Sequence, residues 1–321
     1  MLKSSTRALN GSRAADQLQV TVMRAELAAQ IDHLVRGDGA FATAIPRLRL
    51  GRVSRTDHPV HGVFDPALCV IAQGSKRVLL GDEVYVYDTS RYLVFAQNLP
   101  VAGQVIDASP EAPHLALRLN FDVKDITALA LKMKLSTAPP SRTPQRGIFT
   151  GELSATLLEP LLRLTRLLDT PEDIPILAPL ISREILYQLL KSADGWRLAQ
   201  MALVDSHSHR IAQAIELLRK RFHEPLRMED LANEVHMSVS ALHHHFKAVT
   251  AMSPLQYQKQ LRLQEARRIM LSEHADAATA GHRVGYDSQS QFTREYSRFF
   301  GAPPVRDVKR LREQQVGGMS G

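Results

Sequence analysis

Two stretches in the C-terminal third decide the fold of that part of the chain. The first, Met237–Leu271, is MSVSALHHHFKAVTAMSPLQYQKQLRLQEARRIML, and the second, Arg283–Asp307, is RVGYDSQSQFTREYSRFFGAPPVRD. Ser238 and Ser288 stand where a hydroxyl would cap a helix by accepting a hydrogen bond from its first-turn amides. The apolar positions that follow at helical spacing are Leu242, Phe246, Phe292 and Tyr296. Each stretch therefore predicts a tight turn followed by a second helix, and a short first helix precedes each turn. This arrangement is a helix-turn-helix unit, and it is present twice.

A long helix is predicted between the two units, over Leu255–Leu271, because Pro254 precedes it and proline favours a first helical turn. At 1.5 Å per residue it would span about 27 Å. Successive major-groove faces of DNA lie about 34 Å apart, so this helix can hold two recognition helices near one groove repeat apart. Its exposed face is expected to carry Arg262, Arg267 and Arg268.

From about His209 to Arg310 the chain resembles the AraC/XylS transcription regulators, through both quoted stretches and the closing Gly-x-x-Pro. The segment Phe64–Asp122, FDPALCVIAQGSKRVLLGDEVYVYDTSRYLVFAQNLPVAGQVIDASPEAPHLALRLNFD, resembles the N-terminal sensing domain of one subgroup. The resemblance implies a cupin-like barrel followed by helices. It also implies an activator that binds promoter DNA and recruits RNA polymerase, with repression left open.

The sequence departs from the family pattern at two positions. His236 stands at the first turn in place of glycine, and a left-handed backbone costs a non-glycine residue about 1 kcal/mol. Gly281 stands where the family prefers alanine within a packed helix, which costs a further ~1 kcal/mol. We therefore expect Gly281→Ala to stabilise the domain, provided that the site has room for a methyl group.

By position in the motif, seven side chains would face the major groove: Ser240, His243, His244, Gln289, Ser290, Gln291 and Arg294. Arginine can bond guanine through two hydrogen bonds, and glutamine can do so with adenine, so the second helix carries the more selective set. Lys247, Thr293 and Arg298 are better placed for phosphates, which fix register rather than sequence. The alternative is that these residues form ordinary solvated helix faces.

Short β-rich runs separated by turns occupy the first part of the chain. They are Leu48–Val53, Leu68–Ala72, Lys76–Leu80, Val84–Tyr87, Tyr92–Ala96, Val101–Ile106 and His114–Phe121. Their close spacing predicts an antiparallel barrel or sandwich that either senses a small molecule or mediates dimerisation. The polar candidates for ligand binding are Tyr85, Tyr87, His114 and Arg118, although alternation does not decide which of them face inward.

Helical spacing predicts further helices over Val22–Val35, Val123–Lys134, Leu153–Leu168, Ile174–Leu190 and Ile211–Phe222. Leucines recur along one stripe of the third of these, which is typical of a core or a dimer face. We expect the fold class to be α+β, with a mobile tail (1–20), a cupin-like sensing or dimerisation domain (21–195), a linker (196–208), an all-helical DNA-binding domain (209–310) and a tail (311–321). A homodimer is expected.

Charge and composition restrict the function further. From His207 to Glu313 there are 17 Lys and Arg against 12 Asp and Glu, in a chain of net charge +7. A basic C-terminal third favours a nucleic-acid partner, the alternative being surplus surface arginine. No apolar run reaches the roughly 18 residues of a membrane span. The single cysteine, Cys69, fits a reducing compartment, so we expect a cytoplasmic protein.

No metal, cofactor or catalytic site is expected. Consecutive helical residues lie about 100° apart, so the run His243–His245 cannot chelate one ion from one face. His58, His61 and His114 lack the clustering of a cupin metal site, and no nucleophile elbow or phosphate-binding glycine loop occurs. The alternative to a regulator is a cupin-type enzyme with a helical appendage, an interpretation that rests on the barrel architecture alone.

Overall fold

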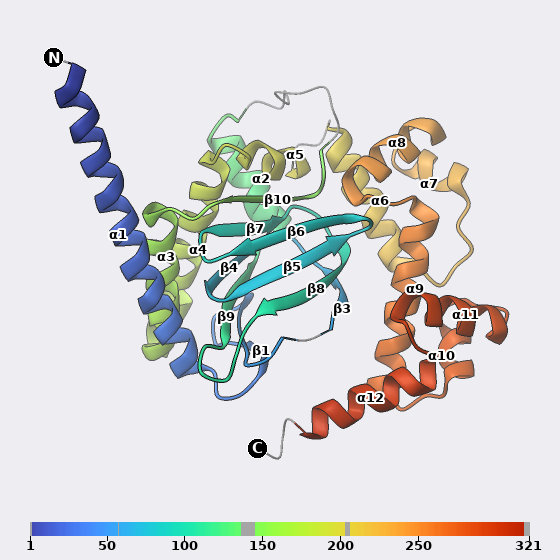
Figure 1. Cartoon of the computed structure of the whole chain (residues 1–321). Helices are drawn as coiled ribbons and strands as arrows, with labels where there is room; N and C mark the ends of the chain where they lie inside the picture. Colours follow the sequence, from blue (N-terminus) through green and yellow to red (C-terminus); the bar gives the residue numbers. More distant parts are fainter. Residues whose placement is uncertain (1, 57, 136–144, 203–205, 318–321) are drawn as a thin grey trace.

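The computed structural model describes residues 2–317, except for 57, 136–144 and 203–205 (Figure 1). The strands are β1 (Gly39–Ala42), β2 (Leu48–Val53), β3 (Val60–Phe64), β4 (Ala67–Gln73), β5 (Ser75–Leu80), β6 (Glu83–Asp88), β7 (Arg91–Phe95), β8 (Leu99–Asp107), β9 (His114–Asn120) and β10 (Ile148–Glu152). The helices are α1 (Leu2–Leu34), α2 (Val123–Lys132), α3 (Ala155–Arg166), α4 (Ile174–Lys191), α5 (Gly195–Ala202), α6 (His207–Lys220), α7 (Met228–Glu234), α8 (Val239–Thr250), α9 (Pro254–Ser272), α10 (Ala277–Arg283), α11 (Gln289–Phe300) and α12 (Pro304–Gly317).

The strands form two antiparallel sheets. The larger has the order β1-β2-β9-β4-β7-β10, and the smaller has the order β3-β8-β5-β6. The α+β class is confirmed, but the expected barrel is not closed, because the ladders of the described residues leave β1, β10, β3 and β6 as edges. The chain passes between the sheets at Gly74, where φ is +85° and a Cβ would lie 2.5 Å from the Asp107 carbonyl oxygen.

All seven predicted strands are present, as β2 and β4 to β9. Three further strands were not predicted. The residues of β1 are all exposed and show no apolar alternation, while β3 is interrupted by Gly62. The third, β10, pairs with β7 through Ile148 and Phe149, beyond the point where helical spacing begins.

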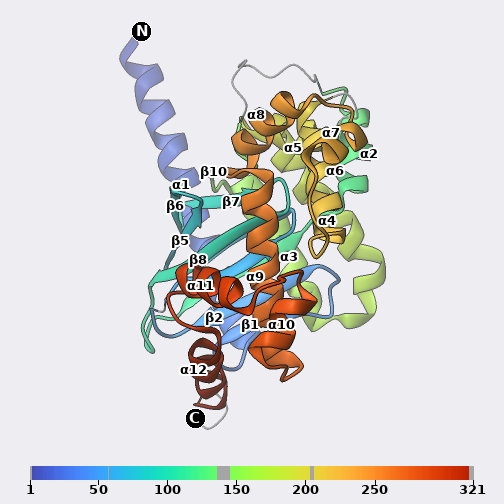
Figure 2. The ribbon, with the colours of Figure 1, turned by 90° about the vertical axis from the view of Figure 1, so that its right-hand side faces the viewer.

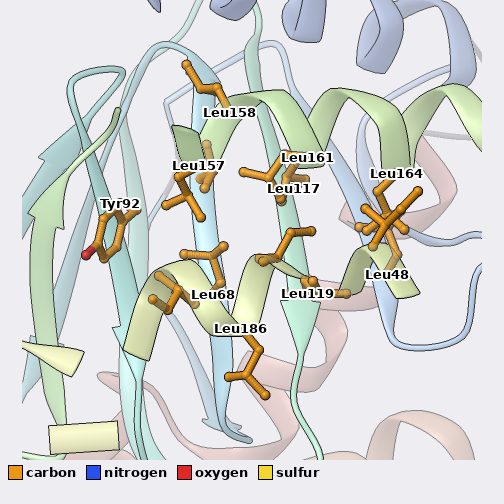
Figure 3. Close-up of a cluster of buried hydrophobic side chains, with 14 of the residues drawn as sticks. Leu48, Leu68, Tyr92, Leu117, Leu119, Leu157, Leu158, Leu161, Leu164 and Leu186 are labelled. Carbon is orange, nitrogen blue, oxygen red and sulfur yellow. The ribbon is translucent and has the colours of Figure 1, made fainter. Parts of the chain in front are cut away.

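Helices α1, α3 and α4 cover the outer face of the larger sheet (Figure 1). Figure 3 shows Leu157, Leu161 and Leu164 of α3 above Leu117 and its neighbours on the sheet. All of these side chains are buried, which confirms the predicted leucine stripe as core. Burying a leucine contributes about 1.5–3 kcal/mol, so this layer holds the N-terminal part together.

The C-terminal helices form two units joined by α9. Figure 2 shows α8 near one end of α9, and α10 and α11 near the other. The N-terminal part packs directly on this assembly, since the core between the sheets continues into α6 to α9. One hydrogen bond across the junction runs from the Tyr257 hydroxyl to the Asn98 carbonyl oxygen, at 3.0 Å.

The segments expected as tails and linker lie largely in helices. α1 begins at Leu2, α5 and α6 occupy most of 196–208, and α12 extends to Gly317; residues 1, 203–205 and 318–321 lie outside the described part. Within that part, no helix combines the length and apolar composition that crossing a bilayer requires.

Candidate DNA interface and inter-sheet interior

The predicted caps of both recognition helices are confirmed. The Ser238 hydroxyl accepts from the Ala241 amide at 3.2 Å, and the Ser288 hydroxyl accepts from the Gln291 amide at 3.3 Å. The connecting helix α9 begins with a capping box between Ser253 and Gln256. Each cap satisfies amides that would otherwise lack partners, so each helix starts at a fixed residue.

Both turns use left-handed backbone. His236 has φ of +52° and confirms the predicted strained turn of the first unit. Gly285 has φ of +90° in the second turn, where a Cβ would lie 2.2 Å from the His223 carbonyl oxygen. Glycine is therefore required at the second turn by close approach as well as by conformation.

The predicted DNA-contacting side chains lie on the outer faces of α8 and α11. The exposed ones are Ser240, His244, Lys247, Gln289, Ser290, Gln291, Arg294 and Arg298, while His243 and Thr293 are half-buried. The opposite stripe is buried and consists of Leu242, Phe246, Phe292 and Tyr296. Among the described residues Arg294 forms no ion pair, so its guanidinium is available to a partner.

Of the three arginines expected on the exposed face of α9, Arg268 is exposed, whereas Arg262 and Arg267 are half-buried; all three form contacts within the protein. Arg262 donates to the carbonyl oxygens of Phe222, at 2.6 Å, and Gly285, at 2.7 Å. It also donates to those of His223 and Glu224. Arg262 thus links the α6–α7 loop to the turn of the second unit, which its helical spacing alone did not indicate.

The other two arginines are paired with acids. Arg267 lies 2.8 Å from the carboxylate of Asp307, which is fully buried and also accepts from the Tyr296 hydroxyl at 2.9 Å. Arg268 pairs with Glu265 and Glu273 on the surface. Asp307 therefore fixes α12 against α9 and α11.

The expected stabilisation by Gly281→Ala depended on room for a methyl group, and the structure does not offer that room. A Cβ on Gly281 would lie 2.9 Å from Cγ and 3.0 Å from Cδ1 of the Phe292 ring. Gly281 is buried in α10, and Phe292 is itself fully buried. The glycine lets α10 approach the recognition helix α11 closely. The close packing of the two helices offsets the low helical propensity of glycine.

The N-terminal part contacts both recognition helices near their C-terminal ends. The Arg146 guanidinium donates to the carbonyl oxygen of Lys247 at 2.9 Å and pairs with Glu83 at 2.5 Å. The Gly147 amide donates to the Val249 carbonyl oxygen at 2.9 Å. On α11, the ring of Phe299 lies 4.6 Å from that of His61 in β3. These contacts leave the first turns of both recognition helices free.

The histidine run on α8 divides into different environments. His245 is half-buried and stacks on His207 at 4.0 Å between ring centroids. Burial, together with the neighbouring His207 and His244, lowers the pKa of His245. Among the residues that the structure describes, no three His, Cys, Asp or Glu side chains are grouped to hold a metal ion.

Three of the four predicted ligand residues lie in the space between the sheets. Tyr87 and His114 are buried and Arg118 is half-buried, and all three belong to the faces that the two sheets turn toward each other. Tyr85 lies nearer the edge, where its hydroxyl donates to Glu83 at 2.7 Å. Sequence alternation missed Lys76, whose side chain points into the same space, because a lysine in a strand ordinarily indicates a solvent-facing position.

Burial raises the pKa of the Cys69 thiol, which lies in this interior next to Tyr87. A raised pKa keeps the sulfur protonated and unreactive. Cys69 is therefore a packing residue of β4.

Comparison with known families places two matches along the chain. Residues 44–197 match the family described as the AraC-type transcriptional regulator N-terminus, and residues 231–310 match a helix-turn-helix domain family. The first is the segment of sheets and helices, and the second contains both units and α9.

Individual relatives match over parts of their length. The chain is 28% identical over 143 residues to the HTH-type transcriptional regulator ArgR of Pseudomonas aeruginosa, covering 44% of this chain and 42% of that protein. It is 25% identical over 158 residues to the HTH-type transcriptional activator RhaS of Escherichia coli, covering 49% of this chain and 56% of that protein. The chain thus matches about half the length of these relatives.

Solved structures of ToxT from Vibrio cholerae share the fold over most of both chains. An apo form has a TM-score of 0.53 at 11% identity, covering 85% of this chain and 98% of that one. The form with bound unsaturated fatty acid has a TM-score of 0.54 at 10% identity, covering 85% and 96%. At this identity the likeness concerns the arrangement of sheets and helices.

Proposed function

Because this chain belongs to the AraC family of transcriptional regulators, we propose that it binds a specific promoter sequence through both helix-turn-helix units. Its family makes it a DNA-binding regulator of transcription and not an enzyme. We assign α8 and α11 to two successive major grooves on one side of the duplex. The base contacts come from the seven groove-facing residues named above, and the phosphate contacts come from Lys247, Thr293 and Arg298.

One observation carries this proposal: two capped helices, each with exposed polar residues in its first two turns, stand at opposite ends of one 19-residue helix. At 1.5 Å per residue α9 spans about 28 Å, near the groove repeat of about 34 Å. The contacts with the N-terminal part lie at the other ends of both recognition helices. The exposed polar residues Ser240 and His244 of α8, and Gln289 to Gln291 of α11, therefore remain open to DNA.

Binding of the full chain to random-sequence and promoter duplexes over a range of salt concentrations tests this proposal. We expect log K to fall linearly with log salt for both, because phosphate contacts release counterions, and to be higher for one promoter sequence. Equal affinity for every duplex, or none at low salt, would contradict it.

We further propose that the chain is a cytoplasmic activator that contacts RNA polymerase and acts as a homodimer. The name of RhaS as an activator supports activation, and the resemblance to the AraC/XylS regulators implies the contact with RNA polymerase. The exposed apolar residues Ile176 (70% exposed) and Leu180 (61% exposed), with Tyr187, form one face of α4 and support the second. A second copy can cover such a face through the same helix. Leu180→Glu should convert a dimer into a monomer in analytical ultracentrifugation.

A reporter gene tests the activator separately: its transcription should increase when the wild-type chain is present.

The N-terminal domain is proposed to sense a small molecule that alters DNA affinity. The fatty-acid-bound ToxT structure shares this fold and supports the proposal. Arg146 contacts α8 and His61 contacts α11, so a shift of either sheet would displace a recognition helix. These contacts can therefore couple effector binding to DNA binding. An effector must bind the DNA-competent and incompetent states unequally to act in this way.

A further inference from the structure

The two helix-turn-helix units are joined to the N-terminal part in different ways. The first unit shares one continuous core with the sheets, to which β8 contributes Leu99, α8 contributes Phe246 and α9 contributes Tyr257. The core of the second unit is separate, and its described buried residues all come from α9 to α12 and the turns between them. The first unit is therefore fixed to the sheets through a shared interior, whereas the second is held through α9.

The change from one core to the other falls within α9. Tyr257 and Leu261 belong to the first core, and Leu263 and Ala266 belong to the second. Arg262 supports this point through its bonds to the α6–α7 loop. Helices of this length ordinarily curve, and a bend at this point would move α11 relative to α8. The distance and angle between the recognition helices thus depend on what holds α11 in place.

Strand β3 supplies a contact at the far end of α9. It is an edge of the smaller sheet and lies beside α9 (Figure 1). The centroid of the His61 ring lies 4.6 Å from that of Phe299 and 5.4 Å from that of Phe300, both in the last turn of α11. The Phe300 ring lies in turn 4.5 Å from that of Tyr296, which is fully buried. Ring contacts therefore join His61 to the interior of the second unit.

The surroundings of His61 suit an uncharged aromatic ring. Among the described residues, its half-buried side chain forms no hydrogen bond or ion pair, so its contribution is ring packing. The Arg267 guanidinium carbon lies 4.3 Å from the centre of the Phe300 ring in the same cluster. Burial and Arg267 lower the pKa of His61, although Asp307 acts in the opposite direction. A neutral imidazole thus packs on the two phenylalanine rings.

We propose that His61 is a positioning residue for DNA specificity: by bracing α11 from the N-terminal domain, it sets the spacing between the two DNA elements that the chain accepts. This rests on the proposed function, in which α8 and α11 bind successive major grooves. One base pair added between the elements moves the second about 3.4 Å along the duplex and turns it by about 35°. A braced pair of helices fits one spacing, whereas a pair joined through α9 alone can follow neighbouring spacings.

The experiment measures the affinity of the full chain for duplexes that carry the two elements found by selection and differ only in the number of base pairs between them. The wild-type chain should bind the selected spacing about tenfold more tightly, or more, than a duplex with one base pair added or removed, because a displaced element loses base contacts as a mismatch does. His61→Ala should reduce this ratio by about twofold to tenfold, the range that one aromatic pair contributes to an equilibrium constant. Affinity for a duplex with the first element alone should be unchanged, because the shared core fixes α8.

Two further variants separate positioning from a general loss of structure. His61→Phe retains an aromatic ring and should keep the wild-type ratio. Val60→Ala is the matched control, because it changes the neighbouring residue of β3, which is 61% exposed, and it should also keep the ratio. An unchanged ratio in His61→Ala, or an equal loss in His61→Ala and His61→Phe, would overturn the proposal.

The same measurements distinguish this proposal from the proposed function on which it rests. Selective binding of the two elements by the wild-type chain, with the same dependence on spacing in His61→Ala, refutes the positioning role alone. Equal affinity of the wild-type chain for every duplex, including those that lack both elements, refutes the sequence-specific regulator and the positioning role together.

Discussion

Arg146 donates a hydrogen bond to the main-chain carbonyl oxygen of Lys247, at 2.9 Å, and so ties the N-terminal domain to the first recognition helix. The same guanidinium donates to the next carbonyl, that of Ala248, at 2.5 Å. These carbonyls belong to the last turn of α8, where helical amide partners run out; that of Lys247 also accepts from the Ala251 amide at the end of the helix, at 2.9 Å. A cation placed there also interacts favourably with the helix dipole.

Replacing Arg146 by alanine should lower the free energy of unfolding of the full chain by about 1–2 kcal/mol, the range for partly exposed hydrogen bonds from a charged donor. Hydrogen exchange should also become faster at the Gly147 amide, which bonds to Val249. Arg47→Ala is the control, because Arg47 pairs with Asp122 and Asp125 inside the N-terminal domain. Identical exchange at Gly147 in both variants would show that Arg146 does not hold the domains together.

Gly281→Ala should destabilise the C-terminal domain by about 1–3 kcal/mol, the usual effect of overpacking a core. The cause is the 2.9 Å approach of the new methyl group to the Phe292 ring. Denaturant unfolding of Gly281→Ala, Phe292→Leu and the double variant measures the coupling between the two sites. The double variant should lose less than the sum of the single losses. Strict additivity, or a gain from Gly281→Ala, would mean that the helices can separate without cost.

His114 should make the protein less stable in acid. Its folded pKa is about 4, below the ordinary value of 6.5, so below pH 6.5 the unfolded chain takes up a proton that the folded chain does not. Stability therefore falls as the pH decreases from 6.5 to 4, by roughly 3 kcal/mol at most. Chemical denaturation at several pH values should show a shallower fall in His114→Gln. His33→Gln, at an exposed position of α1, should leave the pH profile unchanged; an equal change in both variants would contradict the assignment.

Lys247→Ala should weaken binding to all duplexes by a similar factor and reduce the slope of log K against log salt by about one, as expected for the loss of one phosphate contact. The main-chain carbonyl that Arg146 binds is unaffected by this substitution. Lys259 provides the control, because its Nζ is paired with Glu295 at 2.9 Å. Lys259→Ala should keep the wild-type slope, and a slope unchanged by Lys247→Ala would remove Lys247 from the interface.

Local sequence signals predicted the parts of the fold that local physics determines. Ser238 and Ser288 marked the start of both recognition helices because capping depends on a residue and the amides two or three positions later. Helical spacing likewise predicted the buried stripe of Leu242 and Phe246. These features need no information from distant parts of the chain.

Features that depend on distant segments were missed or misjudged. Arg262 lies on α9 at a surface-type position, yet its acceptors come from the α6–α7 loop and from Gly285. The sequence indicated only that Gly281 lowers helical propensity, because residue spacing does not reveal that the Phe292 ring packs against this glycine. The barrel remains open because strand pairing at its edges is decided by tertiary register, and Lys76 points inward against the usual preference of lysine.

Arg294 on α11 is the strongest single candidate for base recognition, being exposed, unpaired among the described residues and able to form two hydrogen bonds with guanine. Arg294→Ala should weaken binding to the preferred site by about 1–3 kcal/mol and relax preference at one or two adjacent base pairs. Arg306→Ala is the control, because it removes the same positive charge at an exposed position of α12.

Selection of bound sequences from a random duplex library, with the full chain and with Arg294→Ala, tests the central claim most directly. The account predicts a wild-type motif of two elements about 10 base pairs apart, one for each recognition helix. Arg294→Ala should relax one element and leave the other intact, and Arg306→Ala should leave both intact. Absence of any enriched motif from the wild-type chain, or an unchanged motif from Arg294→Ala, would contradict the assignment of α8 and α11 to adjacent major grooves.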